Sequence, residues 1–86
     1  MEKLASITIL TKNRQQNSPE LNKILTEGGH LIMSRMGVNV QKTCTEHCPG
    51  MIILALKAKS EDIIGLFEKI NRIDEVSAEM SMFEDN

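Results

Sequence analysis

The feature that most constrains the fold is the run Met51 to Ala58, in which every side chain except Lys57 is apolar. A short run of this kind is typical of a β-strand that is covered on both faces. We therefore expect it to lie in the middle of a sheet. Helices would cover one face of that sheet, and the other face would need a different cover.

Three other segments have the pattern of strands. Lys3 to Thr11 is rich in β-branched residues, and Val76 to Met82 alternates apolar and polar side chains. His30 to Val40 is also extended in pattern, but Gly37 interrupts it. A glycine inside a strand indicates a bulge or a close approach of another backbone.

Two helices are predicted between these strands. Ser18-Pro19-Glu20 predicts the start of the first, because serine is a good N-cap, proline fits the first turn and an acid suits the positive helix end. Gly28 and Gly29 predict its end, through glycine in the left-handed conformation. The second helix is predicted to begin at Ser60-Glu61-Asp62. Its apolar side chains form one stripe: Ile63, Leu66, Phe67 and Ile70.

The resulting order, β-α-β-β-α-β, predicts an α+β, ferredoxin-like sandwich over residues 1–86 as a single domain. Two helices would cover one face of a four-stranded antiparallel sheet, with the first and third strands in its middle. The residues expected in the core are Ile7, Ile9, Leu21, Ile24, Leu25, Ile53, Ile63, Phe67, Ile70 and Val76. The other face would carry alternate apolar side chains, which predicts a homo-oligomer, either a dimer or a tetramer built as a dimer of dimers.

Composition excludes several classes of function. The net charge is −2, and the aromatic residues are two Phe with no Tyr or Trp. The chain therefore lacks both the basic field that holds a phosphate backbone and the rings on which bases stack, so we expect no direct nucleic-acid binding. No apolar run approaches the roughly 20 residues needed to cross a bilayer. We expect a cytoplasmic protein with no membrane association.

The segment Glu27 to Val38, together with the preceding helix at Leu21 to Leu25, carries a family resemblance. It resembles the small family of iron-only hydrogenase system regulators, and the most specific part is the step Arg35-Met36-Gly37-Val38. The resemblance implies an ACT-like ferredoxin fold, related to the ligand-binding domain of the nickel-responsive regulator. It also implies oligomeric assembly, a regulatory role and a small-molecule or metal effector.

One feature of ACT-like modules is only half matched. These modules often carry Asn or an acid and then Pro-Gly at the turn into the first helix, where backbone N–H groups meet an amino-acid ligand. Asn17 and Pro19 match this pattern, but Glu20 stands at the glycine position. A carboxylate there would repel the carboxylate of an amino acid, which argues against that effector class.

The clearest chemical cluster is Cys44, His47 and Cys48, which holds both cysteines of the chain. Two thiolates and an imidazole suit a transition metal, and a tetrahedral site would need one more ligand, from His30 or from a second subunit. Two alternatives remain open. The cysteines could form a reversible disulfide, or the cluster could be an exposed hairpin tip with idle thiols.

Catalysis is not expected from this cluster. Cys44 beside His47 lacks an orienting third group and an oxyanion hole in the sequence, so we predict that the chain is not an enzyme. Lys12, Arg14 and Lys23 could form a small anion site near the first helix, although scattered basic residues are usually a solvated face.

Two hypotheses about function follow. The first is an oligomeric ACT-like regulatory or sensor module, connected to an iron-only hydrogenase system. The alternative is a metal- or thiol-dependent binding protein that uses Cys44, His47 and Cys48 and has no transcriptional role. Fold alone cannot distinguish them.

Overall fold

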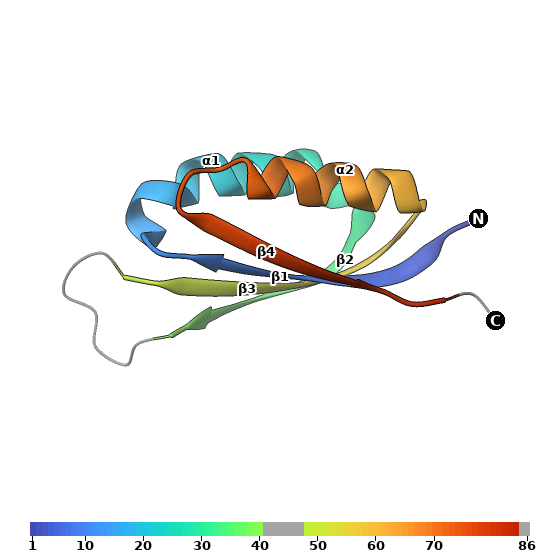
Figure 1. The fold of residues 1–86 in the computed structure, drawn as a ribbon, viewed down its shortest axis with the longest axis horizontal. Helices are drawn as coiled ribbons and strands as arrows, with labels where there is room; N and C mark the ends of the chain where they lie inside the picture. The colour runs from blue at the N-terminus through green and yellow to red at the C-terminus, as the bar shows by residue number, and fades with distance from the viewer. Residues whose placement is uncertain (41–47, 85–86) are drawn as a thin grey trace.

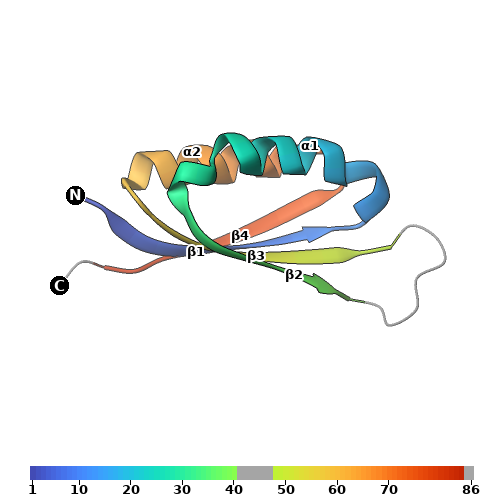
Figure 2. The same cartoon turned by 180° about the vertical axis from the view of Figure 1, so that it is seen from behind.

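The computed structural model describes residues 1–40 and 48–84. The elements are β1 (Lys3–Thr11), α1 (Arg14–Glu27), a short 3-10 turn η1 (Gly29–Leu31), β2 (Ile32–Asn39), β3 (Gly50–Ala58), α2 (Ser60–Asn71) and β4 (Val76–Met82). The four strands form one sheet in the order β2-β3-β1-β4, and every neighbouring pair is antiparallel. Both helices lie on the same face of the sheet (Figures 1 and 2). The predicted ferredoxin-like fold is confirmed, with β1 and β3 in the middle.

The core lies between the two helices and the sheet. Of the residues expected in the core, seven are buried: Ile7, Ile9, Leu21, Leu25, Ile63, Ile70 and Val76. Ile24 and Phe67 are partly buried against the same cluster. The prediction for Ile53 was wrong, because successive strand residues point to opposite faces and Leu54 and Leu56 take the helix-facing positions of β3. Ile53 lies on the face without helices.

Helix α1 starts earlier than the sequence indicated. Its N-cap is Asn13, whose side chain accepts a hydrogen bond from the backbone N–H of Gln16 at 3.2 Å, and Pro19 lies inside the helix. The missing N–H of Pro19 removes one helical bond, yet the helix continues. The hydroxyl of Ser18 donates to the carbonyl oxygen of Arg14, so Ser18 is a second-turn residue and not a cap.

Asn17 connects the start of α1 to two other parts of the chain. Its side-chain oxygen accepts a hydrogen bond from the hydroxyl of Thr11 at 2.6 Å, and its amide donates to the carbonyl of Asp74 at 3.0 Å. Asn17 thus joins the end of β1 to the connection between α2 and β4. In the same connection Glu75 adopts a left-handed φ of 64°, and its carbonyl accepts the N–H of Lys12 at 3.1 Å. Asn17 is therefore a structural residue in this chain, although it matches the ACT ligand pattern.

Two expectations about glycine were also wrong. Helix α1 does end at Gly28, but Gly28 has φ −92°, and no glycine in the described residues has a positive φ. A Cβ at Gly28 would lie 3.1 Å from a methyl carbon of Leu66, so the close approach of α2 is what requires glycine. The irregularity in β2 occurs between Ile32 and Ser34, whereas Gly37 pairs in register with Ile52.

No helix in the described part of the chain combines the length and the apolar character that crossing a membrane requires.

Candidate functional site

Cys48 is buried at the entrance to β3, with 1% of its surface exposed. Its carbonyl oxygen accepts the backbone N–H of Arg14, the first residue of α1, at 2.8 Å. Its sulfur is part of a disulfide. Cys44 and His47, the other two residues of the sequence cluster, lie outside the described residues. The metal and redox roles of this cluster therefore stay predictions.

His30 lies at the opposite end of α1 from Cys48. Cys48 contacts the start of this helix, which has 14 residues, and His30 is in the η1 turn that follows its end. At 1.5 Å per residue a helix of this length spans about 21 Å. Within one chain, His30 is therefore too far from Cys48 to share a metal ion with it.

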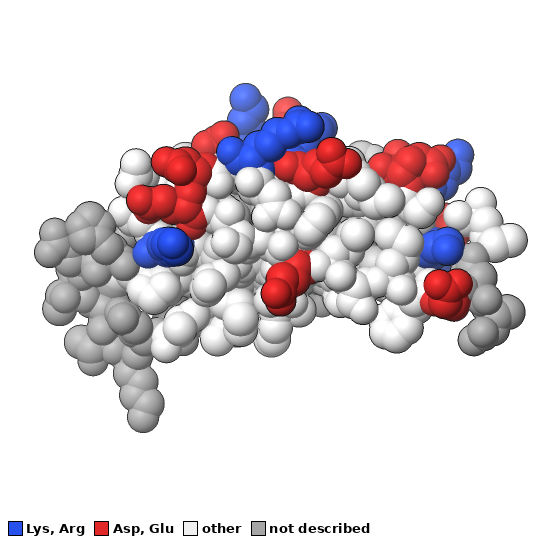
Figure 3. Space-filling model, viewed as in Figure 1, with Lys and Arg blue, Asp and Glu red and all other residues white. Residues whose placement is uncertain are grey.

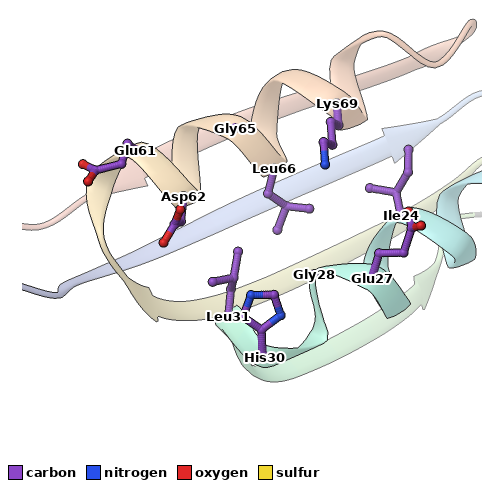
Figure 4. A pocket seen from close by; sticks show the side chains of 10 residues that line it. All are labelled: Ile24, Glu27, Gly28, His30, Leu31, Glu61, Asp62, Gly65, Leu66 and Lys69. Carbon is purple, nitrogen blue, oxygen red and sulfur yellow. The ribbon is translucent and has the colours of Figure 1, made fainter.

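A groove lies between the end of α1, η1 and α2, with a volume of about 250 Å³ (Figure 4). The side chains of His30, Asp62 and Lys69 point into it, whereas Glu61 points away from it. Glu27 also lines the groove, so it contains charges of both signs. In the described residues no three His, Cys, Asp or Glu side chains converge closely enough to hold a metal ion. The groove is therefore a surface of mixed charge.

Gly65 lines this groove from the middle of α2, where glycine costs about 0.5–1 kcal/mol relative to alanine. A Cβ at Gly65 would meet no atom within 4 Å. Packing therefore does not require glycine at this position, in contrast to Gly28 on the other wall.

We expect the two alanine substitutions to have opposite effects on folding stability. Gly65→Ala should raise the free energy of unfolding by about 0.5–1 kcal/mol, because only the helix propensity changes. Gly28→Ala should lower it by about 1 kcal/mol, because the new methyl group would press on Leu66, a core side chain. Urea denaturation of both variants measures the difference. A destabilised Gly65→Ala variant would show that the groove is packed more tightly than the structure indicates.

The largest candidate surface is the face of the sheet that no helix covers. Cross-strand pairing aligns Leu10 of β1 with Met51 of β3, and Met51 with Val38 of β2. The next row that crosses the same strands consists of Thr8, Ile53 and Met36. We call these six residues the apolar rows. Leu10, Val38 and Met36 are exposed, and Met51 and Ile53 are partly buried.

Charge is sparse around the apolar rows. Side chains alternate between the two faces along each strand, and the pairing register places Lys57 and Glu79 on this face. They are the charged side chains of the four strands that lie on it. The following row, Ser6, Ala55 and Ser34, consists of small residues. Figure 3 shows that, on the side of the molecule in view, most charged side chains lie over the helices and few lie along the sheet. The uncovered face is therefore suited to contact with a protein surface.

The sequence pattern predicts the uncovered face, but it predicts neither the composition of that face nor the groove of Figure 4. Gly65 in the middle of α2 is a sequence signal for the groove, because glycine inside a helix lowers its stability and usually has a packing or functional reason. The register that aligns the apolar rows has no such signal, because pairing between strands is not visible in the order of residues.

The chain matches the model of a known protein family. The family model described as "TM1266-like: Iron-only hydrogenase system regulator, putative" matches residues 3–80. Among curated proteins, no sequence matches the chain.

Several solved structures share the fold. The uncharacterized protein TM1266 from Thermotoga maritima is 21% identical, with a TM-score of 0.86, and the match covers 98% of this chain and 100% of that one. A PII-like signaling protein from Thermus thermophilus is 11% identical, with a TM-score of 0.63 and coverage of 94% and 87%. CPII from Thiomonas intermedia, bound to ADP and bicarbonate, is 14% identical, with a TM-score of 0.61 and coverage of 96% and 91%. At these identities the similarity concerns the fold.

Proposed function

This chain belongs to the TM1266-like family of iron-only hydrogenase system regulators, and we propose that it is a non-enzymatic regulatory module that works as a homo-oligomer and responds to a small molecule. The family supplies the regulatory context. The oligomer, the effector and the absence of catalysis are inferences from the surfaces described above.

The observation that carries the proposal is the uncovered sheet face with its apolar rows. Exposed contiguous apolar patches on small domains mark interaction sites. A second copy of the same chain is a suitable cover, because the apolar rows contain no charge that would repel its counterpart across a symmetric contact. Each subunit would then remove the other's apolar rows from water.

Two further observations support a regulator that binds and does not catalyse. A PII-like protein of the same fold, CPII, is known in a form bound to ADP and bicarbonate, so this fold accommodates small molecules. In the groove of Figure 4, His30 has no serine, threonine or cysteine among the lining residues. Nucleophilic catalysis with His30 as the base would need such a group within hydrogen-bond reach.

The regulatory role is tested by disrupting the gene for this chain in its source organism and measuring hydrogenase activity and transcript levels. We expect both to change, and we expect the wild-type chain to restore them. The variant Met36→Glu, which places a charge in the apolar rows, should fail to restore them. Hydrogenase activity and transcripts that are unaffected by the disruption would contradict the regulatory role.

The alternative, a metal- or thiol-dependent binding protein that uses Cys44, His47 and Cys48, is favoured by one contact. Because the carbonyl of Cys48 accepts the N–H of Arg14, a chemical change at Cys48 would reach the start of α1. Anaerobic purification, elemental analysis and thiol titration of the wild type and of the variants Cys44→Ser and Cys48→Ser test this alternative. Both variants are needed, because Cys48 is buried and its substitution also changes packing. Stoichiometric metal that both variants lose would support a metal site. Absence of metal after the disulfide of Cys48 is reduced, together with thiols that do not re-form it on mild oxidation, would contradict both the metal and the redox versions.

A further inference from the structure

A second groove, of about 380 Å³, lies between α1 and the strands β2 and β3. It opens on the helix side of the sheet, although Val38 and Met51 of the apolar rows also belong to its lining, and it does not share lining residues with the groove of Figure 4. Its size lies within the range of pockets that hold small organic molecules, about 300–1,000 Å³. We call it the α1–β2 groove.

Arg35 contributes the clearest chemical feature of this groove. In β2 it pairs with Leu54, a core residue, so the alternation of the strand directs Arg35 toward the helices. Its guanidinium donates a hydrogen bond to the side-chain oxygen of Asn22 in α1 at 2.9 Å. A guanidinium has five N–H donors in a rigid fork, so one such bond leaves donors for a second acceptor. Asn22 fixes the guanidinium at the groove without neutralising its charge.

Arg14, the first residue of α1, also lines this groove. Its side-chain stem packs on β3, because a Cβ at Gly50 would lie 3.3 Å from its Cδ atom. Gly37 is the second strand glycine in the groove, and a Cβ there would meet no atom within 4 Å. Gly50 thus makes room for Arg14, and Gly37 leaves open space in the groove.

The charge of the groove differs from that of the whole chain. The net charge of the protein is −2, yet among the described residues the ionisable side chains that line this groove are those of Arg14 and Arg35, with no aspartate or glutamate. The groove of Figure 4, in contrast, is lined by three carboxylates. Apolar side chains, among them Leu21 and Ile52, form other parts of the α1–β2 groove. The hydroxyls of Thr11 and Ser18 already donate within the protein.

From this combination we infer that the α1–β2 groove binds a small organic anion, with its carboxylate or phosphate group on Arg35 and its apolar part against Leu21 and Ile52. A guanidinium matches the planar geometry of a carboxylate or phosphate and can bind it through two parallel hydrogen bonds. The inference rests on the proposed function only in that the anion would be the small molecule to which the regulatory module responds. The binding itself depends on the groove and not on assembly.

The test uses benzoate and phenyl phosphate as the two anionic probes, with benzyl alcohol as the neutral analogue. Titration calorimetry and amide NMR shifts of the full chain should show binding of at least one anion, and benzyl alcohol should bind at least tenfold more weakly. Comparing the two anions shows whether the groove takes a carboxylate or a phosphate. Shifts should concentrate in α1, β2 and the start of β3.

Three variants decide whether Arg35 is responsible. Arg35→Gln should weaken binding of the anion at least tenfold. Arg72→Gln is the matched control, since Arg72 is a well-exposed arginine on α2 that pairs with Glu68, and it should bind as the wild type does. Gly37→Ala has room for its methyl group, so it should fold normally and bind more weakly, because it narrows the groove.

The outcomes separate this inference from the proposed function. Equal affinity of Arg35→Gln and the wild type for the anions, or no anion binding with a Kd below about 1 mM, would overturn the anion site. Sedimentation of the same samples reports assembly independently. A monomeric wild type that still binds the anion through Arg35 would retain the site and contradict the oligomer.

Discussion

Met36→Glu is expected to convert the assembled protein to monomers. Met36 is 55% exposed in the isolated chain and lies in the apolar rows beside Ile53. In a contact between two sheet faces, the new carboxylate would be removed from water without a partner, and two symmetry-related copies would repel each other. We expect at least a hundredfold weaker association, or about 2.7 kcal/mol, measured by sedimentation velocity over a range of concentrations.

The control for this variant is Ile64→Glu. Ile64 is an exposed apolar residue of similar accessibility, 40%, but it lies on α2, away from the uncovered sheet face. Its substitution should leave the sedimentation coefficient unchanged, and circular dichroism should show that both variants keep their secondary structure. If Met36→Glu assembles like the wild type, the apolar rows are not the contact between subunits.

Leu54→Ala should lower the free energy of unfolding by about 2–5 kcal/mol, the usual cost of truncating a buried leucine. Leu54 is fully buried between the sheet and the helices. A domain of this size typically has a total stability of about 5–15 kcal/mol, so the variant would be partly unfolded at moderate urea concentrations. Urea denaturation followed by circular dichroism measures the change.

Ile53→Ala, one residue earlier in the same strand, is the comparison. Ile53 lies on the uncovered face, where it pairs with Thr8 and Met36. In the Met36→Glu background, which removes the contribution of assembly to stability, its cost should be about 1 kcal/mol or less. In the wild-type background it should weaken assembly instead. Equal costs for Leu54→Ala and Ile53→Ala in the Met36→Glu background would show that the two faces of β3 are assigned incorrectly.

The contrast between Ile53 and Leu54 illustrates the limit of hydrophobic pattern. Met51 to Ala58 is apolar on both faces, so periodicity identifies a central strand but does not distinguish its two sides. Only the alignment of β3 with β1 and β2 shows which side chains meet the helices. A shift of one residue would exchange the two faces.

The start of α1 shows a similar limit for capping signals. Asn13 and Ser18 are both acceptable N-caps, and Pro19 favours the second. The structure uses Asn13, because the helical turn that follows brings Asn17 to Thr11 and Asp74. The last of these partners is 57 residues away in the chain. No local signal reports such a bond.

What the sequence determined by itself was the order of the elements, the fold class, the family and the presence of an uncovered apolar face. These properties follow from local periodicity and from a contiguous motif, which neighbouring residues carry without reference to the rest of the chain. Only the tertiary structure decided that His30 and Cys48 lie at opposite ends of α1. It also decided that Gly28 leaves room for the side chain of Leu66, and that Arg14 and Arg35 line one groove. Each of these facts joins residues from different elements, and their distances depend on packing and strand register.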